Sequence, residues 1–225
     1  MPQPLNIALD GPVASGKTTV GQILAQKLGY RFIDTGAMYR ALTWKALVRK
    51  VDLNDEAGLT QLASTTHIDL LWGDHGGRPF SVLVDGEDVT AELRRPEVDR
   101  GVSLVAKVPS VRQALVSRQR AMAREGPVVM AGRDIGTVVL PHASLKVYLE
   151  ASAEVRALRR YHELRDMGIQ TDYHDILESL TRRDDIDSNR SDSPLRPAAD
   201  ARRINTDALT LDQVVGVILD LAGNN

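Results

Sequence analysis

The 225-residue chain contains no cysteine. Disulfide bonds and thiolate metal sites are therefore excluded, and we expect a reducing, cytoplasmic location. Aromatic residues are scarce as well, at 4% of the chain, and the formal net charge is only −2. So small a net charge creates no general basic field that would attract nucleic acid or an anionic membrane, and we expect neither as a partner.

Long apolar runs are also missing. No run approaches the ~18 residues that a membrane-spanning helix needs, and Asp10 interrupts the apolar run near the N-terminus, so no signal peptide is expected. Hydrophobic residues still make up 43% of the chain and charged residues 26%, as is usual for globular domains. A chain of this length can bury one core and has room for a subdomain.

Lysine makes up only a small share of the basic residues. Only six of the 28 basic residues are lysine, so 22 are arginine. Arginine is favoured where phosphate is held by paired hydrogen bonds, although a coding bias toward arginine would give the same composition. The positions of the arginines must distinguish the two explanations.

A phosphate-binding pattern, G-x-x-x-x-G-K-[ST], is complete at residues 11–18. A short apolar run at 5–9 precedes it and a helical pattern follows, so successive backbone N–H groups should point at one anion. Lys17 would then supply charge to the β- and γ-phosphates, and the Thr18 hydroxyl would ligate Mg²⁺. The ATP-binding residues predicted from this pattern are Gly11, Pro12, Val13, Ala14, Ser15, Gly16, Lys17, Thr18 and Thr19.

Strand and helix patterns alternate along most of the chain. Strands are predicted at 5–9, 31–34, 127–131, 145–149 and 203–206. Helices are predicted at 18–28, about 35–48, 56–64, 101–107, 110–124, 153–167, 173–184 and 211–221. This alternation indicates an α/β fold with a doubly wound parallel sheet of about five strands.

Two segments depart from the alternation. Short strands and tight turns at about 66–98 indicate a small antiparallel β insertion, and the polar stretch 184–200, with Pro194 and Pro197, suits a mobile lid. We therefore expect one P-loop kinase unit over residues 1–225. Its predicted parts are a core of 1–34, 126–172 and 201–225, a monophosphate-binding insertion of 35–125, and a lid of about 173–200.

Several arginines occupy positions that suit phosphate binding. Arg40 follows the second predicted strand, and Arg133 leaves the third at the edge where parallel sheets bind ligands. Arg183 and Arg190 border the predicted lid, and such a set could clamp two phosphorylated substrates. Solvated surface positions are expected instead for Arg49, Arg78, Arg94, Arg118, Arg120 and Arg159.

Four motifs in this order resemble the bacterial cytidylate kinases. They are D-G-P at 10–12, D-T-G-A-M-Y-R at 34–40, G-R-D-I-G-T at 132–137 and R-D-D-I-D-S-N-R at 183–190. The resemblance covers essentially the whole chain, and the β-rich stretch matches the enlarged monophosphate-binding domain of that family. It implies transfer of the γ-phosphate of ATP to CMP, and also to dCMP, with Mg²⁺. The expected partners are these nucleotides, and we expect the chain to be a monomer.

The resemblance also implies roles for individual residues. Thr35, Arg112 and Asp134 are expected to bind the base. Ser103, Arg183 and Asp187 are expected to bind the ribose, and Arg40, Arg133 and Arg190 the acceptor phosphate. The catalytic set implied is Lys17, Arg133, Arg183 and Arg190. Thr35 stands where many members have serine and keeps the hydroxyl, and the loop interior, Val13 to Ser15, is expected to contribute mainly its backbone.

Two alternatives stay open. One is a kinase of another small acceptor, such as UMP, dTMP or shikimate, and the other is a regulator that binds nucleotide without transferring phosphate. A phosphate monoester has a second pKa near 6, so its attacking oxygen needs no general base. Asp134 and Asp187 are therefore interpreted as groups that recognise substrate or orient arginine. Asp10 either supports Mg²⁺ through water or caps the loop.

Overall fold

The structure of the chain is a computed structural model that describes residues 6–72 and 80–223, so Arg78 and the predicted turn at 73–77 lie outside the described residues. The chain folds as two compact units. The first combines Met1–Phe32 with Pro127–Asn225, and the second comprises Ile33–Gly126. Within the described ranges, no helix is both long and apolar enough to cross a membrane.

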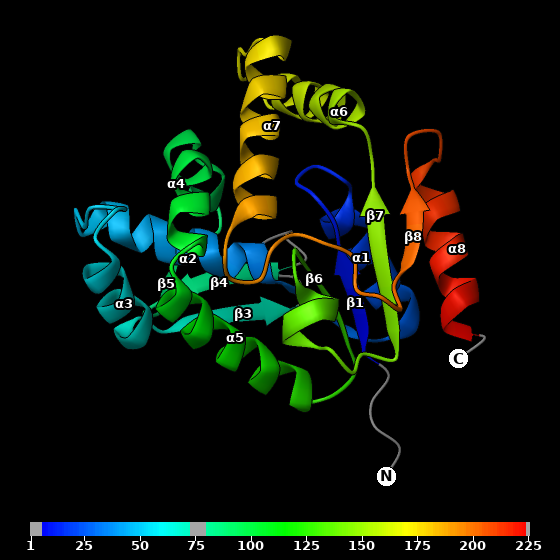
Figure 1. The fold of residues 1–225 in the computed structure, drawn as a ribbon, viewed down its shortest axis with the longest axis horizontal. Helices are drawn as coiled ribbons and strands as arrows, with labels where there is room; N and C mark the ends of the chain where they lie inside the picture. Colours follow the sequence, from blue (N-terminus) through cyan, green and yellow to red (C-terminus); the bar gives the residue numbers. More distant parts are fainter. Residues whose placement is uncertain (1–5, 73–79, 224–225) are drawn as a thin grey trace. The chain divides into compact units, whose positions relative to one another are not determined.

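The first unit is built on a five-stranded sheet in the order β2-β6-β1-β7-β8 (Figure 1). The strands are β1 (Ile7–Asp10), β2 (Arg31–Asp34), β6 (Val128–Gly132), β7 (Leu145–Glu150) and β8 (Arg202–Asn205). β1 pairs in parallel with both β6 and β7, which places Leu9 opposite Ala131 and Val147. Strands this apolar and buried on both faces are typical of parallel sheets. The predicted α/β fold is confirmed.

Helices lie between these strands and after the last of them in the same unit. They are α1 (Lys17–Leu28), α6 (Ala153–Asp166), α7 (Tyr173–Asn189) and α8 (Leu211–Gly223), together with one π-helical turn, η2 (Ile135–Val139), that the sequence patterns did not predict. Gly29 ends α1 in the left-handed conformation, with φ of 68°, as a helix-terminating glycine does. In Figure 1 the hairpin of α6 and α7 lies beyond the carboxyl end of β7.

Helix α7 is longer than predicted. It was expected to end near Asp184 but continues to Asn189, so the first part of the polar stretch is helical. The Asp172 side chain caps its N-terminus, and Ile176 and Leu180 pack against Ala157 of α6. With this anchored start and no proline before Pro194, the helix extends into the polar residues.

The second unit contains helices α2 (Thr35–Val48), α3 (Glu56–Thr65), α4 (Pro96–Ala106) and α5 (Pro109–Arg124), and a short 3₁₀ turn, η1 (Glu92–Arg94). Its antiparallel sheet has the order β3 (Ile68–Trp72), β4 (Phe80–Val84) and β5 (Glu87–Asp88), which confirms the predicted β insertion. Helix α4 begins five residues before the predicted start at Gly101. The reason is Pro96, whose fixed φ and missing N–H suit the first position of a helix.

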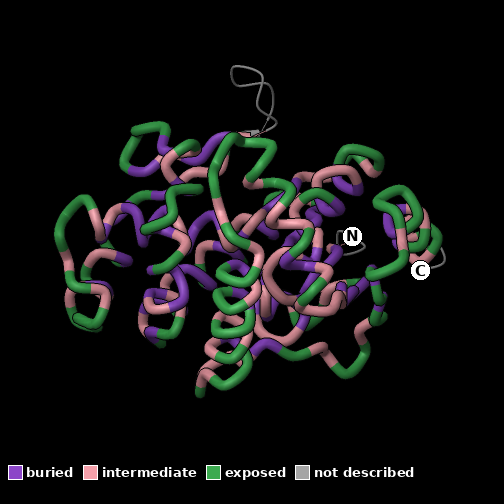
Figure 2. The backbone as a smooth tube through the Cα atoms, turned by 90° about the horizontal axis from the view of Figure 1, so that it is seen from above, coloured by how far each residue is buried: buried purple, intermediate pink, exposed green. Residues whose placement is uncertain are grey.

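Burial follows the helical and strand periodicities, and Figure 2 shows buried and exposed residues alternating along the helices. Arg49, Arg94 and Arg120 are exposed, as predicted. The surface prediction is wrong for Arg118 and Arg159, which bind backbone carbonyls. Arg118 donates from Nη1 and Nη2 to carbonyls at the end of α3, at 2.7 and 2.9 Å, where a helix leaves C=O groups unpaired. Arg159 donates to the Thr206 carbonyl at 2.6 Å, just beyond β8.

Candidate functional site

The glycine-rich loop between β1 and α1 has a backbone that its sequence explains. Gly11 has a φ of 147°, and a Cβ there would lie 2.3 Å from the carbonyl oxygen of Leu149. Gly16, with a φ of 89°, is the N-cap of α1. Only glycine satisfies both constraints, so the loop can run close to the end of β7 and direct its amides at the N-terminus of α1.

Lys17 is buried, with 7% of the residue exposed, and lies over this loop. Its Nζ donates hydrogen bonds to the Pro12 carbonyl at 2.5 Å and to Ser15 Oγ at 3.2 Å. The loop therefore holds its own lysine in a bent conformation, with the positive charge beside the loop amides. This combination of lysine, amides and helix N-terminus suits the oxygens of a polyphosphate.

Asp10 ends β1, directly before the loop. Its two carboxylate oxygens accept hydrogen bonds from the backbone N–H groups of Ile135 at 2.6 Å and Gly136 at 2.7 Å. Burial raises the pKa of Asp10 to about 6, against the opposing effect of these two hydrogen bonds. These hydrogen bonds hold the turn η2 in place after β6.

A second group of charged residues lies where β6 ends. Arg133 follows β6, and its Nε donates to Asp187 Oδ2 of α7 at 2.8 Å. The Asp187 side chain is only 7% exposed. Burial raises the pKa of this carboxyl, but the charges of Arg133, Arg183 and Arg190 more than offset that effect and hold it below its usual value. The positive charges of three arginines thus act on one carboxylate, and Arg133 contacts it directly.

Asp134 belongs to the same group. It is buried, and its Oδ1 lies 3.8 Å from Nη2 of Arg190. Arg190 also donates from Nε to the carbonyl of Ser193 at 2.6 Å, at the turn that follows α7. The sequence motifs of 132–137 and 183–190, although about fifty residues apart, therefore meet at one end of the sheet.

The other predicted site residues lie in the second unit. Thr35 is buried at the start of α2, and Arg40, one turn further, donates from Nη2 to Asp99 Oδ1 of α4 at 2.8 Å. A Cβ at position 36 would lie 3.0 Å from Asp34 Oδ1 and 3.5 Å from Arg40 Nη1. Gly36 therefore leaves room for a carboxylate and a guanidinium side by side.

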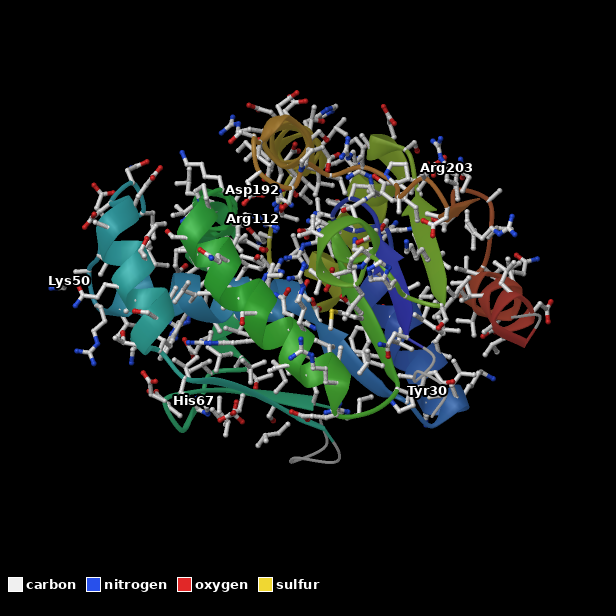
Figure 3. All side chains as sticks on the ribbon, turned by 60° about the horizontal axis from the view of Figure 1, so that its bottom comes forward. Tyr30, Lys50, His67, Arg112, Asp192 and Arg203 are labelled. Atoms are coloured by element: carbon white, nitrogen blue, oxygen red, sulfur yellow. The ribbon has the colours of Figure 1, made fainter. Side chains whose placement is uncertain are left out.

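Ser103 lies on α4 and Arg112 lies on α5 of that unit. Both are buried, with 7% and 2% of each residue exposed. The Arg112 guanidinium, labelled in Figure 3, lies 5.8 Å from the centre of the Tyr39 ring and donates to the Ala106 carbonyl at 3.4 Å. A buried arginine whose guanidinium packs against an aromatic ring suits recognition of a polar group.

Two residues that the motifs did not single out carry important contacts. Asp99 holds Arg40, and Arg156 of α6 contacts both the glycine-rich loop and α7. Neither lies in a recognisable pattern. The available signal was the placement of Arg156 three residues after a predicted helix start, which does not distinguish it from a surface arginine.

A magnesium ion fits the donor set around Thr18. Across 6–72 and 80–223, no group of three or more His, Cys, Asp or Glu could hold a metal ion on its own. Mg²⁺ prefers oxygen ligands and commonly takes few from the protein, with the rest from phosphates and water. A threonine hydroxyl in the first turn of α1, next to a phosphate-binding loop, matches that requirement.

Comparisons with known proteins agree with this geometry. The family model described as cytidylate kinase matches residues 7–224. A cytidylate kinase of Pelotomaculum thermopropionicum is 50% identical over 95% of this chain and 94% of its own length. One of Desulforamulus reducens is 52% identical over the same shares of the two chains. Among solved structures, an uncharacterized protein from Eubacterium ventriosum has a TM-score of 0.53 at 12% identity over 99% of both chains, which shows a shared fold.

Proposed function

Because the chain belongs to the cytidylate kinase family, whose members are nucleoside monophosphate kinases, we propose that it transfers the γ-phosphate of ATP to CMP and also to dCMP. The observation that carries this proposal is the arginine group at the end of β6. Arg133 binds Asp187, and the charges of Arg183 and Arg190 also act on this carboxylate, in the unit that also holds the phosphate loop. A protein that only binds nucleotide would have no use for a second phosphate-binding group.

The triphosphate is bound by the loop from Gly11 to Thr19. Its amides and Lys17 contact the β- and γ-phosphates, where negative charge shifts during transfer. The Thr18 hydroxyl would hold Mg²⁺ when the triphosphate is bound, and the ion would supply further neutralisation of that charge. Lys17 needs little reorganisation for this role, since the loop already holds its ammonium group.

The acceptor is bound by the two groups of residues predicted from the motifs. Arg40, Arg133 and Arg190 bind its phosphate, while Asp99 and Asp187 orient the first two of these arginines. Ser103, Arg183 and Asp187 contact the ribose. Thr35, Arg112 and Asp134 contact the base. No residue needs to act as a base, because the attacking phosphate oxygen is largely deprotonated at neutral pH. Positioning and charge neutralisation make up the catalysis.

Position 36 argues against shikimate as the acceptor. The motif there is D-T-G rather than a paired-acid D-x-D, and a Cβ added at position 36 would lie only 3.0 Å from Asp34 Oδ1. An assay of ADP release with CMP, dCMP, UMP, dTMP, AMP and shikimate separates the candidates. We expect the highest kcat/KM with CMP. A higher value with another acceptor would overturn the proposed substrate, and no ADP release with any of them would favour a nucleotide-binding regulator.

A further inference from the structure

Arg156 is a buried arginine on α6 that the proposed mechanism does not use. Its side chain is 5% exposed, and each of its three guanidinium nitrogens makes a hydrogen bond. Nε donates to the Ala151 carbonyl at 3.0 Å, Nη1 to the Val13 carbonyl at 3.1 Å, and Nη2 to Asp184 Oδ2 at 2.5 Å. One side chain thus connects the end of β7, the phosphate loop and α7.

The contact with Val13 bears on the loop conformation. The next residue, Ala14, has a φ of 59°, which is in the left-handed region that residues with a Cβ rarely adopt. Such a conformation persists where the surroundings hold it in place. Because the peptide group is planar and trans, fixing the Val13 carbonyl toward Arg156 turns the Ala14 N–H to the opposite side, away from α6.

Val13 also attaches the loop to the α6–α7 hairpin through its side chain. It packs against the apolar cluster of Ala157, Ile176 and Leu180, which lies between the two helices. The expectation that interior loop residues contribute mainly their backbone is therefore incomplete for Val13. Its carbonyl accepts from Arg156 of α6, and its side chain packs against the cluster between α6 and α7.

The contact with Asp184 reaches the other half of the site. Asp184 lies one helical turn before Asp187 and next to Arg183 on α7. Its Oδ2 accepts from Arg156, and the pair is largely removed from water. The turn of α7 that carries the acceptor-binding residues is therefore fixed to the same guanidinium as the phosphate loop.

We infer that Arg156 is a positioning residue for phosphoryl transfer: it holds the Val13–Ala14 peptide with its amide turned toward the bound phosphates and fixes α7 to the loop through Asp184. The inference rests on the proposed function. A guanidinium is suited to this role because its donors are rigid and point in three directions, whereas lysine has a single nitrogen on a flexible stem.

The first test compares R156Q and R156K with R182Q as a matched control. Arg182 is an exposed arginine on α7 that pairs only at the surface with Glu178, at 2.7 Å, among the contacts that the structure describes. We expect R156Q to lower kcat about tenfold to a hundredfold, as displaced catalytic groups do, and R182Q to leave it unchanged. R156K should have a melting temperature close to that of the wild type, but its kcat should stay as low as that of R156Q. Full recovery of kcat by R156K, or a wild-type kcat for R156Q well below its melting temperature, would show that Arg156 is merely structural.

The second test isolates the loop and needs no acceptor. Isothermal titration calorimetry with MgADP should show that R156K binds MgADP more weakly than the wild type does. Adding A14G should restore part of that affinity, because glycine adopts the left-handed conformation without strain. If A14G restores none of it, Arg156 does not act through this peptide. These titrations remain informative if the acceptor proves not to be CMP, and that outcome is decided separately by wild-type assays.

Discussion

Asp187 of α7 accepts a hydrogen bond from Arg133 Nε at 2.8 Å, which joins the end of β6 to the helix bearing two other arginines of the site. The carboxylate is nearly buried, and three arginine charges offset the cost of that burial. A buried ion pair is strongly destabilised when one partner is removed, because the other charge is left uncompensated. The proposed acceptor binding therefore relies on a pair that also stabilises the fold.

Asp187→Asn should destabilise the protein in a pH-dependent way. The pKa of Asp187 is lowered from 3.8 in the folded protein, so its charged form stabilises the fold above that value. This stabilisation is lost as the pH falls through the lowered folded pKa. Urea unfolding should show the variant about 1.5–3 kcal/mol less stable at pH 7, with the gap closing below pH 3.8.

The matched control is Asp185→Asn, a change at an exposed aspartate of the same helix. We expect its free energy of unfolding to stay within about 0.5 kcal/mol of the wild type. A gap for D187N that did not change with pH would mean that the charge of Asp187 adds nothing to stability.

Lys17→Ala should abolish phosphoryl transfer and preserve the fold. Lys17 donates to the Pro12 carbonyl and to Ser15 Oγ within its own loop, whereas its charge is needed at the phosphates. The expected loss is roughly 3 kcal/mol or more in transition-state stabilisation, as for other preorganised charge contacts. Steady-state kinetics and near-UV circular dichroism check both parts. Retention of more than about a tenth of the wild-type kcat would place the triphosphate elsewhere.

Gly11→Ala should destabilise the protein and weaken MgADP binding, because the added Cβ would overlap the Leu149 carbonyl at 2.3 Å. We expect a cost of about 1–3 kcal/mol from the backbone shift, measured by urea unfolding. Gly216→Ala provides the comparison, since among the described residues its added Cβ in α8 would meet no atom within 4 Å other than neighbouring backbone of its own helix. That change should stabilise the protein by about 0.5–1 kcal/mol. Equal effects at both positions would refute the steric argument.

Asp134→Asn should narrow the preference for CMP over UMP. Cytosine offers an N4 amino donor, and uracil offers an O4 acceptor at the same place, which an ionised carboxylate cannot bind. Asparagine provides both a donor and an acceptor, so kcat/KM should fall for CMP and the CMP/UMP ratio should shrink. Equal losses for both substrates would assign Asp134 a structural role beside Arg190, which lies 3.8 Å away.

The segment from Arg190 to Asp200 should become protected from proteases when substrates bind. Its far end is anchored, because Lys146 Nζ donates to Asp200 Oδ2 at 2.8 Å, so closure would move the part between that anchor and α7. Limited proteolysis should cut this part in the free protein, and CMP with a non-hydrolysable ATP analogue should reduce cutting. The same cutting rate with and without ligands would argue against a lid.

The sequence alone determined the phosphate loop, the five strands, most helices and the antiparallel insertion. These features depend on residues close together in the chain: glycines at a turn, apolar runs of strand length, and helical periodicity. Where a boundary was missed, as for α4 and α7, the deciding features were a proline at a helix start and packing against another helix.

Only the tertiary structure decided how the charged residues are paired. Arg133 and Asp187 are 54 positions apart, and Arg156 and Val13 are 143 apart, so no local pattern relates them. Arg118 and Arg159 were mistaken for surface residues for the same reason: the carbonyls that they bind are far away in the sequence. An arginine has the same appearance in a sequence whether it faces water or a carbonyl, and only the fold determines which of the two lies within reach of its guanidinium.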